Sequence, residues 1–384
     1  MTDSSTPTVN GVPGGPQGVG QPDGKQPGGE QPGGKKGAGR VIATVVAVLV
    51  VLAIVAGVGW FVKNRQSTAS AEGTTGAAKP VIAVSARTTD SDYYVQWLNG
   101  VKKEAARIGA TLKIYDANGD DSQQILDIES ATALKPAAIL VDHGLEGIEP
   151  NVKKALDAGI PVVGFDSVIS DSRAISVSQS DEKLSKLATD RLVKDTDGKA
   201  TVIYAYVAGF APLDARNKVW ESVKKANPGI KQVAQVGVVN DSTAQQTAEQ
   251  VKASLQAHPD TTVVFAPYDE FAKGATQAVE ELGLTGKVKV YGVDISDADI
   301  AVLGKTDSPW VLTATTDPSN VGAVAIRTAF RAGEGKQTTK DVLVPPALVT
   351  AEEIRKNKIS SVSQLVKYFP SLVTDDISPV AEAK

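Results

Sequence analysis

The sequence of 384 residues predicts an α/β protein with two doubly wound, parallel-sheet lobes preceded by one transmembrane helix. Three observations predict this class. From Pro80 onward, short apolar runs alternate with helical patterns, which is typical of parallel sheets covered by helices on both faces. The alternation comes in two successive sets, each too long to extend a single compact sheet comfortably. Ahead of them, residues 41–62 form one uncharged apolar stretch that is long enough to span a bilayer.

Residues 1–40 do not have the composition of a folded domain. They are dominated by Gly, Pro, Gln and Ser and include an imperfect five-residue repeat, QPDGK-QPGGE-QPGGK, from Gln21 to Lys35. Such a segment cannot bury enough apolar surface to offset the entropy of ordering it, so we expect a disordered tail. The alternative is a proline-rich docking site, because Pro13 and Pro16 have the PxxP spacing.

The stretch VIATVVAVLVVLAIVAGVGWFV, residues 41–62, predicts a transmembrane helix. It would extend over about 33 Å at about 1.5 Å per residue, against about 30 Å for a bilayer core. Trp60 and Phe61 suit the interface at its far end, and the cations around it favour the N-terminus inside and the remainder outside. The alternative is a cleaved signal peptide, since Ala69-Ser70-Ala71 has the A-x-A form. The length of the stretch favours an uncleaved anchor, followed by a flexible linker over residues 63–79.

The first set of elements begins at Pro80. Strands are expected at 80–86, 111–117, 137–143 and 161–166. Helices should lie between them, the first capped by Ser91 or Asp92, the next from about Asp121 and the third through Val152 to Ala158. In the first helix, the residues that recur on one face, and should therefore be buried, are Tyr94, Leu98, Val101 and Ala105.

The second set repeats this rhythm. Strands are expected at 174–178, 200–206, 231–237, 261–266, 288–294 and 310–316. Helical patterns separate them, and a last helix runs from about Asn320 to Ala332. In doubly wound folds of this kind, the ligand crevice lies outside the carboxyl ends of the strands.

Polar side chains gather at those strand ends. Asp142, Asp166, Asp269 and Asp294 each follow an apolar run, and Tyr268 precedes Asp269 in VVFAPYDEFAKGA. Any one of these carboxylates is as readily explained as the N-cap of the next helix. Four of them, in both halves and beside aromatic residues, favour a binding cleft.

Composition excludes several other functions. The 40 basic and 44 acidic residues give a net charge of −4, which is not the signal of a nucleic-acid-binding protein. The absence of cysteine excludes disulfides, thiolate metal sites, cysteine nucleophiles and lipid attachment through cysteine. The only histidines are His258 and His143, of which His143 either borders the cleft or is a loop residue without function. Since no phosphate loop, HExxH or GxSxG motif occurs, we expect neither catalytic residues nor a metal or other cofactor.

Four stretches carry a resemblance to a known family. They are VIAVSARTTDSDYYVQWLNGVKKEAARIGATLKIYD, AGIPVVGFDS, LQAHPDTTVVFAPYDEFAKGA and KVYGVDIS. In order and spacing the chain resembles the type I periplasmic binding proteins, most closely the ribose-binding group of sugar receptors for ABC transporters, over roughly residues 80–350. The first stretch resembles the segment where paired aromatics stand at the family's cleft. The second resembles the motif whose Asp grips sugar hydroxyls, and the last two resemble segments that supply ligands from the second lobe.

Carried over position by position, the resemblance implies a set of substrate-binding residues. Tyr93 and Tyr94 replace the aromatic pair, and Tyr93 is expected to be the freer because Tyr94 is in phase with the buried face. Asp166 matches the hydroxyl-gripping Asp. The family has a ligand arginine in this region. Arg216 or its neighbour Asp214 falls at that position, since the alignment with the family's pattern leaves both open. The remaining positions, with Asp269 added from its place after a strand, are Arg87, Asn240, Tyr268, Asp269, Asp294 and Thr316.

This sequence departs from the family's pattern at three positions, two of them in this set. Ser167 takes the position of a frequent arginine, and Tyr268 and Thr316 replace two amides. The resemblance therefore implies a polyhydroxylated small molecule as ligand, but not the pattern of a strict ribose receptor.

The resemblance also implies a hinge of three chain crossings between the lobes, near Gln179-Ser180, Thr316-Asp317 and Val344-Pro345. The N-terminal lobe would comprise residues 80–179 and 317–344, and the C-terminal lobe residues 180–316 and 345–350. Residues 351–384 would form a C-terminal extension.

The function implied is that of a monomeric, membrane-anchored extracytoplasmic receptor. It would capture a sugar or polyol between its lobes and deliver it to the permease and ATPase subunits of an ABC importer. The alternative is a membrane-anchored sugar sensor that signals to a membrane kinase or chemoreceptor. Nothing in the sequence after the membrane span separates the two.

Overall fold

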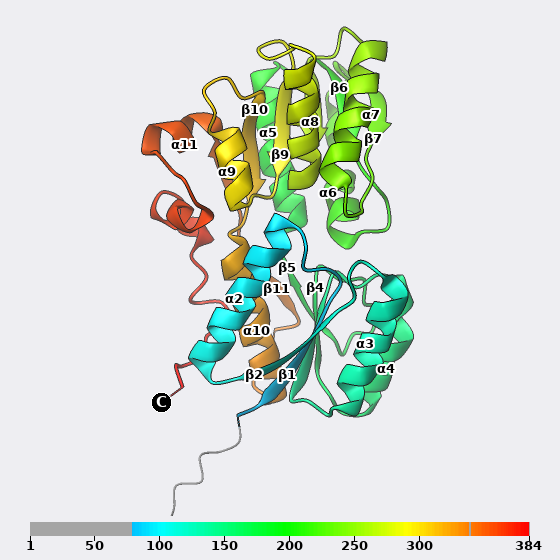
Figure 1. Ribbon diagram of the computed structural model, residues 1–384, viewed down its shortest axis with the longest axis vertical. Coiled ribbons are helices and arrows are strands. Elements are labelled where there is room, and N and C mark those ends of the chain that lie inside the picture. Colours follow the sequence, from blue (N-terminus) through cyan, green and yellow to red (C-terminus); the bar gives the residue numbers. More distant parts are fainter. Residues whose placement is uncertain (1–78, 338, 384) are drawn as a thin grey trace, which may run out of the picture. The chain divides into compact units, whose positions relative to one another are not determined.

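The computed structural model describes residues 79–337 and 339–383, which form two α/β lobes (Figure 1). The tail expected at 1–40, the transmembrane helix expected at 41–62 and all but the last residue of the expected linker lie outside the described residues. Within the part of the chain that is described, no helix is both long and apolar enough to cross a membrane.

The N-terminal lobe is built on a six-stranded sheet of order β11-β5-β4-β3-β1-β2, in which every strand pair is parallel. Apolar residues of helices α2 and α10 cover one face of this sheet, and those of α3 and α4 cover the other. The strands are β1 (Val81–Ala86), β2 (Thr111–Asp116), β3 (Ala138–Asp142), β4 (Val162–Phe165), β5 (Ile175–Ser178) and β11 (Asp341–Leu343). The helices are α2 (Asp92–Ile108), α3 (Asp121–Ala133), η1 (Glu146–Ile148), α4 (Glu149–Asp157) and α10 (Pro318–Gly333).

The C-terminal lobe repeats this plan with the order β12-β10-β9-β8-β6-β7. Helices α5 and α6 pack on one face of its sheet, and α7, α8 and α9 pack on the other. The strands are β6 (Ala200–Ala205), β7 (Ile230–Val236), β8 (Val263–Ala266), β9 (Lys289–Val293), β10 (Trp310–Thr315) and β12 (Ala347–Thr350). The helices are α5 (Asp181–Asp195), α6 (Ala211–Ala226), α7 (Thr243–Ala257), α8 (Asp269–Glu281) and α9 (Asp297–Leu303).

Two strands were not predicted from the sequence. β11 has three residues and β12 four, and Pro345 and Pro346 interrupt the apolar run VLVPPALV (342–349) to which both belong. Both are edge strands, and β12 pairs antiparallel with β10. The C-terminal sheet is therefore mixed at one edge, whereas the alternation of elements predicted a purely parallel one.

The chain passes between the two sheets three times, after β5, after β10 and between β11 and β12. Hydrogen bonds tie these passages to one another. Thr316 Oγ1 donates to Gln179 Oε1 at 2.6 Å, and Ser180 Oγ donates to the carbonyl of Val344 at 3.0 Å. The three passages therefore lie side by side and form the hinge region between the lobes.

The first helix of the N-terminal lobe is held close to α10 by two glycines. A Cβ at Gly100 would lie 2.0 Å from the carbonyl oxygen of Ser319, and one at Gly322 would lie 2.1 Å from the carbonyl oxygen of Trp97. Only residues without a side chain allow the two backbones to approach this closely. This contact fixes α2, which carries Tyr93 and Tyr94, against the helix that leaves the hinge.

The C-terminal segment contacts both lobes. Helix α11 (Ala351–Asn357) and the short helices η2 (Val362–Lys367) and η3 (Pro370–Leu372) bury Ile354, Leu365 and Leu372 in the core of the C-terminal lobe. The chain then continues along the N-terminal lobe, where Arg327 donates hydrogen bonds to the carbonyls of Thr374 and Ile377. This segment is thus a further link between the lobes, and part of it completes a core.

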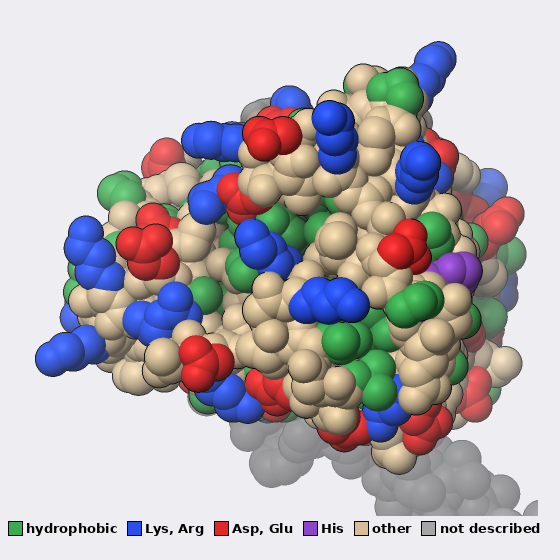
Figure 2. All heavy atoms as spheres, turned by 90° about the horizontal axis from the view of Figure 1, so that it is seen from above, with side chains coloured by type: hydrophobic (Ala, Val, Ile, Leu, Met, Phe, Trp, Pro, Cys, Tyr) green, Lys and Arg blue, Asp and Glu red, His purple; other side chains and the backbone are tan. Residues whose placement is uncertain are grey.

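Charged side chains on the far end of the C-terminal lobe are of mixed sign (Figure 2). Ion pairs in this lobe include Lys305–Glu280 at 3.6 Å, and Lys252 pairs with Glu281. This face therefore carries no extended field of one sign, in agreement with the nearly balanced composition.

Candidate ligand-binding cleft

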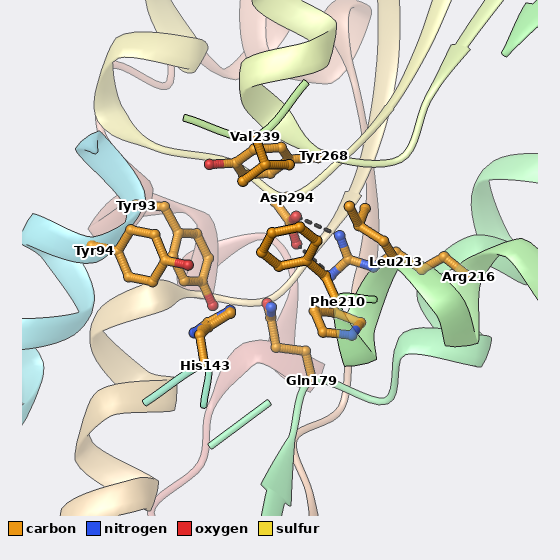
Figure 3. A pocket seen from close by; sticks show the side chains of 11 residues that line it. Tyr93, Tyr94, His143, Gln179, Phe210, Leu213, Arg216, Val239, Tyr268 and Asp294 are labelled. Atoms are coloured by element: carbon orange, nitrogen blue, oxygen red, sulfur yellow. Dashed lines mark hydrogen bonds and ion pairs between the residues drawn. The ribbon is translucent and has the colours of Figure 1, made fainter. Parts of the chain in front are cut away.

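A cavity lies between the carboxyl ends of the two sheets, where the strand order of each sheet reverses. In the N-terminal sheet the reversal is at β1, between β3 and β2, and in the C-terminal sheet it is at β6, between β8 and β7. Ligands of doubly wound folds bind at such switch points. The residues that line the cavity (Figure 3) are Tyr93, Tyr94, His143, Gln179, Phe210, Pro212, Leu213, Arg216, Val239, Tyr268 and Asp294.

The cavity is small and continues into a wider cleft. Its volume is about 50 Å³, measured as the space open to the centre of a water molecule. The outer cleft has about 640 Å³ by the same measure, and it shares Tyr94, Val239 and Tyr268 with the cavity. These three residues therefore separate the inner cavity from the outer cleft.

The aromatic pair of α2 forms the N-terminal wall. Ser91 caps the helix by accepting a hydrogen bond from the backbone N–H of Tyr94, and the two tyrosine rings meet edge to face at 5.9 Å. Tyr93 is only 4% exposed, whereas Tyr94 is partly exposed, which reverses the expectation that Tyr93 would be the freer. The reason is that the buried stripe of α2 follows Tyr93, Trp97 and Val101 at a spacing of four, with Trp97 stacked on Phe165.

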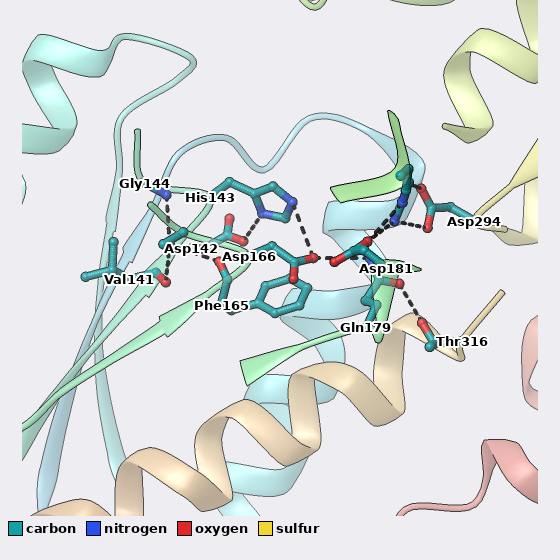
Figure 4. A network of polar contacts seen from close by, with 12 residues as sticks. Val141, Asp142, His143, Gly144, Phe165, Asp166, Gln179, Asp181, Asp294 and Thr316 are labelled. Carbon is teal, nitrogen blue, oxygen red and sulfur yellow. Dashed lines mark hydrogen bonds and ion pairs between the residues drawn. The ribbon is translucent and has the colours of Figure 1, made fainter. Parts of the chain in front are cut away.

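Asp166 directly follows strand β4, and its side chain contacts Gln179 and His143, two residues that line the cavity (Figure 4). Its backbone has a φ of 45°, in the left-handed region that Asp adopts more readily than most residues. Oδ2 accepts a hydrogen bond from Gln179 Nε2 at 3.2 Å, while Oδ1 has no partner within the described residues. Burial, with Asp181 as a second cause, raises the pKa of the Asp166 carboxyl well above its usual range, although His143 opposes the shift. The site therefore contains a buried carboxylate oxygen that can still accept a hydrogen bond.

Asp294 occupies the corresponding place after β9, with a φ of 70°. Arg216 of α6 grips it bidentately, with Nη1–Oδ2 at 2.6 Å and Nη2–Oδ1 at 3.0 Å. The other N–H groups of Arg216 contact Asp181 Oδ1 through Nε and Nη2 and the carbonyl of Pro267 through Nη1. Because a guanidinium has five N–H donors, Arg216 has none left for a ligand. Its role in this arrangement is to hold and orient Asp294.

The C-terminal wall of the cavity is largely apolar. It consists of Phe210, Pro212, Leu213, Val239 and the ring of Tyr268, which packs edge-on against Phe271 at 5.2 Å. Arg87 of the N-terminal lobe lies over the ring of Phe210, with the guanidinium carbon 5.4 Å from the ring centroid. The cavity thus has the polar groups of Gln179, His143 and Asp294 on one side and hydrocarbon on the other.

The structure brings only part of the sequence-predicted set to the cavity. Tyr93, Tyr94, Arg216, Tyr268 and Asp294 line it, and Asp166 lies directly behind Gln179 and His143. Arg87 and Asn240 line the outer cleft instead.

Three predicted residues line neither space. Asp214 accepts a hydrogen bond from Tyr206 Oη at 2.6 Å, and Asp269 is fully buried and accepts from the N–H of Glu270. Thr316 is fully buried and contacts Gln179 in the hinge. Among the residues of this set, Asp214, Asp269 and Thr316 therefore hold neighbouring backbone and side chains in place.

Sequence reasoning missed most of the apolar wall. Phe210, Pro212, Leu213 and Val239 carry no signal that separates a cavity residue from a core residue. Gln179 was expected only as a hinge position. Of the missed residues, His143 had a sequence signal for the cleft, because it directly follows a strand that ends in Asp142. From the sequence alone, a loop residue without function had equal weight. Elsewhere in the described residues, no cluster of three or more His, Asp or Glu side chains has the arrangement of a metal site.

Comparisons with known proteins give consistent results. The model of the periplasmic binding protein domain matches residues 82–337. The chain is 27% identical over 278 residues to the ribose import binding protein RbsB of Escherichia coli, with 72% of this chain and 92% of that protein covered.

Two solved structures with bound ligand are also similar. The 5-methylthioribose transporter solute binding protein from Thermotoga lettingae, in complex with 5-methylthioribose, is 38% identical with a TM-score of 0.74, over 76% of this chain and 93% of that one. An ABC transporter solute binding protein from Agrobacterium vitis with bound allitol is 27% identical with a TM-score of 0.68, over 73% and 98%. The matched regions include residues from both walls of the cavity.

Proposed function

Because the chain belongs to the periplasmic binding protein family, we infer that it is the solute-binding component of an ABC importer and that it captures a sugar or polyol between its lobes. It acts as an extracytoplasmic binding protein and not as an enzyme. Its partners are then the permease and ATPase subunits of the importer.

We propose that the polar side of the cavity binds the hydroxyl groups of the ligand. Asp166 Oδ1 has no partner within the described residues, and a carboxylate can accept hydrogen bonds from two neighbouring hydroxyls. Asp294 faces it from the other lobe, oriented by Arg216, with lone pairs left on both oxygens. The buried hydroxyl of Tyr93 likewise lacks a partner among the described residues. Buried polar groups of this kind cost free energy unless a ligand satisfies them.

The apolar wall of the cavity indicates which class of sugar the protein prefers. The side chains of Phe210, Leu213 and Val239 have no group that could bond a hydroxyl placed against them, and burying such a hydroxyl without a partner would cost free energy. A sugar with an apolar substituent would place that group against the wall and its hydroxyls against Asp166 and Asp294. The relative whose structure contains 5-methylthioribose supports this choice, because that pentose has a methylthio group in place of one hydroxyl. We therefore propose a 5-alkylthio- or 5-deoxypentose as the preferred ligand.

A panel of ligands, measured by thermal shift and calorimetry, tests both whether the protein binds a sugar and whether it prefers one with an apolar substituent. The panel should contain 5-methylthioribose, D-ribose, allitol, a nucleoside and amino acids, applied to the soluble fragment from residue 78. A ligand at 100 times its Kd should stabilise the protein by about 2.7 kcal/mol. Replacing the methylthio group by a hydroxyl should weaken binding about 10- to 200-fold, the range for one well-fitted apolar group. Equal or tighter binding of D-ribose would contradict the apolar substituent, and a response to amino acids alone would contradict the sugar.

A matched pair of variants locates the apolar contact. Val239→Thr keeps the shape of the side chain but places a hydroxyl in the apolar wall, so the preference for 5-methylthioribose over D-ribose should shrink. Val238→Thr makes the same change at the preceding residue, which does not line the cavity. An equal effect of the two variants would show that the change acts through the stability of the loop after β7 and not through the ligand.

Contacts across the cleft support closure of the lobes around the ligand. Lys273 of α8 lies 3.1 Å from Asp92 of α2, and Arg87 reaches over the cleft to Phe210. These contacts join the rims of the two lobes, whereas the hinge joins them at the back. We propose that they form when the ligand is enclosed and break when it leaves.

We further propose that residues 41–62 anchor the protein in the membrane, with residues 1–40 on the cytoplasmic side. The support is the uncharged stretch itself, together with the absence of any cysteine that could carry a lipid. N-terminal sequencing of the mature protein provides the test, and a start at Glu72 would show that the segment is cleaved.

A further inference from the structure

His143 is a polar residue of the cavity with no role so far. It follows β3, has a φ of 47° and is 9% exposed, and its ring lies against Tyr94 at 4.9 Å and Phe165 at 5.1 Å (Figures 3 and 4). These contacts fix the plane of the imidazole. The ring is therefore held in one orientation with one edge toward the cavity.

The two ring nitrogens of His143 have different surroundings. Nδ1 lies 2.6 Å from Oδ1 of the fully buried Asp142, which makes a hydrogen bond. Nε2 lies 3.9 Å from Asp166 Oδ2, which is too long for one. The gap between Nε2 and Asp166 is the size that a hydroxyl can bridge, since a hydroxyl accepts from one group and donates to another.

The two lobes pair their strand-end carboxylates with different cations. Asp294, after β9, is paired with Arg216, which is always charged. Asp166, after β4, is within 4 Å of one basic side chain among the described residues, that of His143. The hydroxyl of Ser167 is bonded to the backbone, accepting from the N–H of Gly144 and donating to the carbonyl of Val141 or that of Phe165. The N-terminal half of the site thus depends on a cation that titrates.

We propose that His143 is a ligand-binding residue whose imidazolium, held between Asp142 and Asp166, donates Nε2–H to a ligand hydroxyl, and that ligand capture is coupled to uptake of a proton. This proposal rests on the sugar-binding function above. A single hydroxyl would accept from His143 and donate to Asp166, so both side chains are satisfied at once. When the ligand excludes water from the cavity, the charge on the imidazole becomes the compensation for two buried carboxylates.

Taken together, the charged and titratable groups around His143 favour its protonated form. Those that face it are Asp142 on its own strand, Asp166 on β4, Tyr94 on α2, Arg87 in the loop after β1, and Asp294 across the cleft. Burial by itself would lower the pKa of His143, but Asp142 above all, with Asp166, outweighs burial and raises that pKa above its ordinary value. The pKa of Asp166 is also raised, chiefly by burial. Both shifts have the same sign, so the folded site holds a proton to higher pH than the unfolded chain does.

The first test uses the unliganded protein and needs no identified ligand. His143 and His258 are the only histidines, so a ring-nitrogen NMR titration contains two sets of signals, and His258→Gln assigns them. We expect the midpoint of His143 to lie above about 6.5, the ordinary value, and to fall in Asp166→Asn. A midpoint at or below 6.5, or one that Asp166→Asn leaves unchanged, would overturn the proposal.

The second test measures binding of 5-methylthioribose and D-ribose by calorimetry between pH 5.5 and 9, in buffers of different ionisation enthalpy. Affinity should fall above the midpoint of His143, at most about tenfold per pH unit, with net proton uptake on binding. His143→Asn should flatten this profile, and Asn suits the left-handed backbone at that position. His143→Gln provides a second variant, and His258→Gln is the matched control that should behave like the wild type.

The outcomes distinguish a failure of the role proposed for His143 from a failure of the proposed receptor function. If a sugar binds with the same affinity and the same pH profile to the wild type and to His143→Asn, the role of His143 is wrong and the receptor function stands. If no sugar or polyol binds to the wild type at any pH, the receptor function falls and the proposal falls with it.

Discussion

Asp166→Asn is the substitution that should separate ligand binding from stability most clearly. The change keeps the size of the side chain and removes its charge, and Asn tolerates the left-handed φ of 45° at this position. Alanine would be a poorer choice, because it adds backbone strain at that φ and a cavity beneath Gln179.

The expected loss of affinity follows from the hydrogen bonds that the carboxylate can accept. A hydrogen bond to a charged group contributes about 1.5–3 kcal/mol, which corresponds to about 10- to 150-fold in Kd. Asp166 Oδ1 has no partner within the described residues, and the proposed function gives it one ligand hydroxyl as donor. We therefore expect the Kd for the best sugar of the panel to rise about 10- to 150-fold.

Asp166→Asn should weaken ligand binding, but it should not lower the free energy of unfolding of the unliganded protein. Burial, followed by the charge of Asp181, raises the pKa of Asp166, so its ionised form is disfavoured in the folded protein. An acid with a raised pKa contributes stability only below its ordinary pKa of about 3.9, and that contribution is lost as the pH rises through the folded-state pKa. Because the folded protein disfavours the ionised form of Asp166, a neutral Asn should leave the free energy of unfolding unchanged or increase it.

Calorimetric titration and urea unfolding of the same variant measure the two quantities. Asp269→Asn is the matched control, because Asp269 is also a buried carboxylate with a pKa raised by burial. Neither carboxylate lines the cavity itself, but Asp166 is bonded to the lining residue Gln179, whereas Asp269 accepts from the backbone N–H of Glu270. The affinity of Asp269→Asn for the sugar should stay near that of the wild type. If Asp166→Asn keeps its affinity within about twofold and loses 1 kcal/mol or more of stability, about the value of one structural hydrogen bond, then Asp166 is a structural residue and the reasoning is wrong.

Three further predictions concern the framework of the site. Arg216→Met should lower the free energy of unfolding by about 3–5 kcal/mol in urea unfolding, because it leaves Asp181 and Asp294 buried without their guanidinium, and a loss below 1 kcal/mol would contradict a buried ion-pair network. Deletion of residues 373–384 should lower the melting temperature of the unliganded protein, because Arg327 loses the carbonyls of Thr374 and Ile377, whereas an unchanged melting temperature would show that this segment does not support the N-terminal lobe. Gly322→Ala should destabilise the protein, since its Cβ would lie 2.1 Å from the carbonyl oxygen of Trp97, while Gly335→Ala is a control with no atom within 4 Å and only the strain of a positive φ.

The sequence alone was sufficient for the two-lobed α/β class of the fold and for the edge of the sheets at which the cavity lies. Buried parallel strands are continuous apolar runs and their covering helices have a distinct period, so the alternation can be read without any tertiary information. Asp166 and Asp294 could be named from the sequence because a carboxylate directly after a buried strand contrasts with its surroundings. The short strands β11 and β12 lack such contrast, and only their pairing at the sheet edges identifies them.

Only the tertiary structure decided which residues share the cavity and what each can still bond. Arg216 looks like a ligand residue in the sequence, but its five N–H groups are all used within the protein, which depends on the positions of Asp181, Pro267 and Asp294 far along the chain. Phe210, Leu213 and Val239 have the same sequence signature as core residues, because burial against protein and burial against a ligand select the same hydrocarbon side chains. Whether such a residue faces a core or a cavity depends on how the two lobes meet, and that arrangement is set by contacts between segments far apart in the sequence.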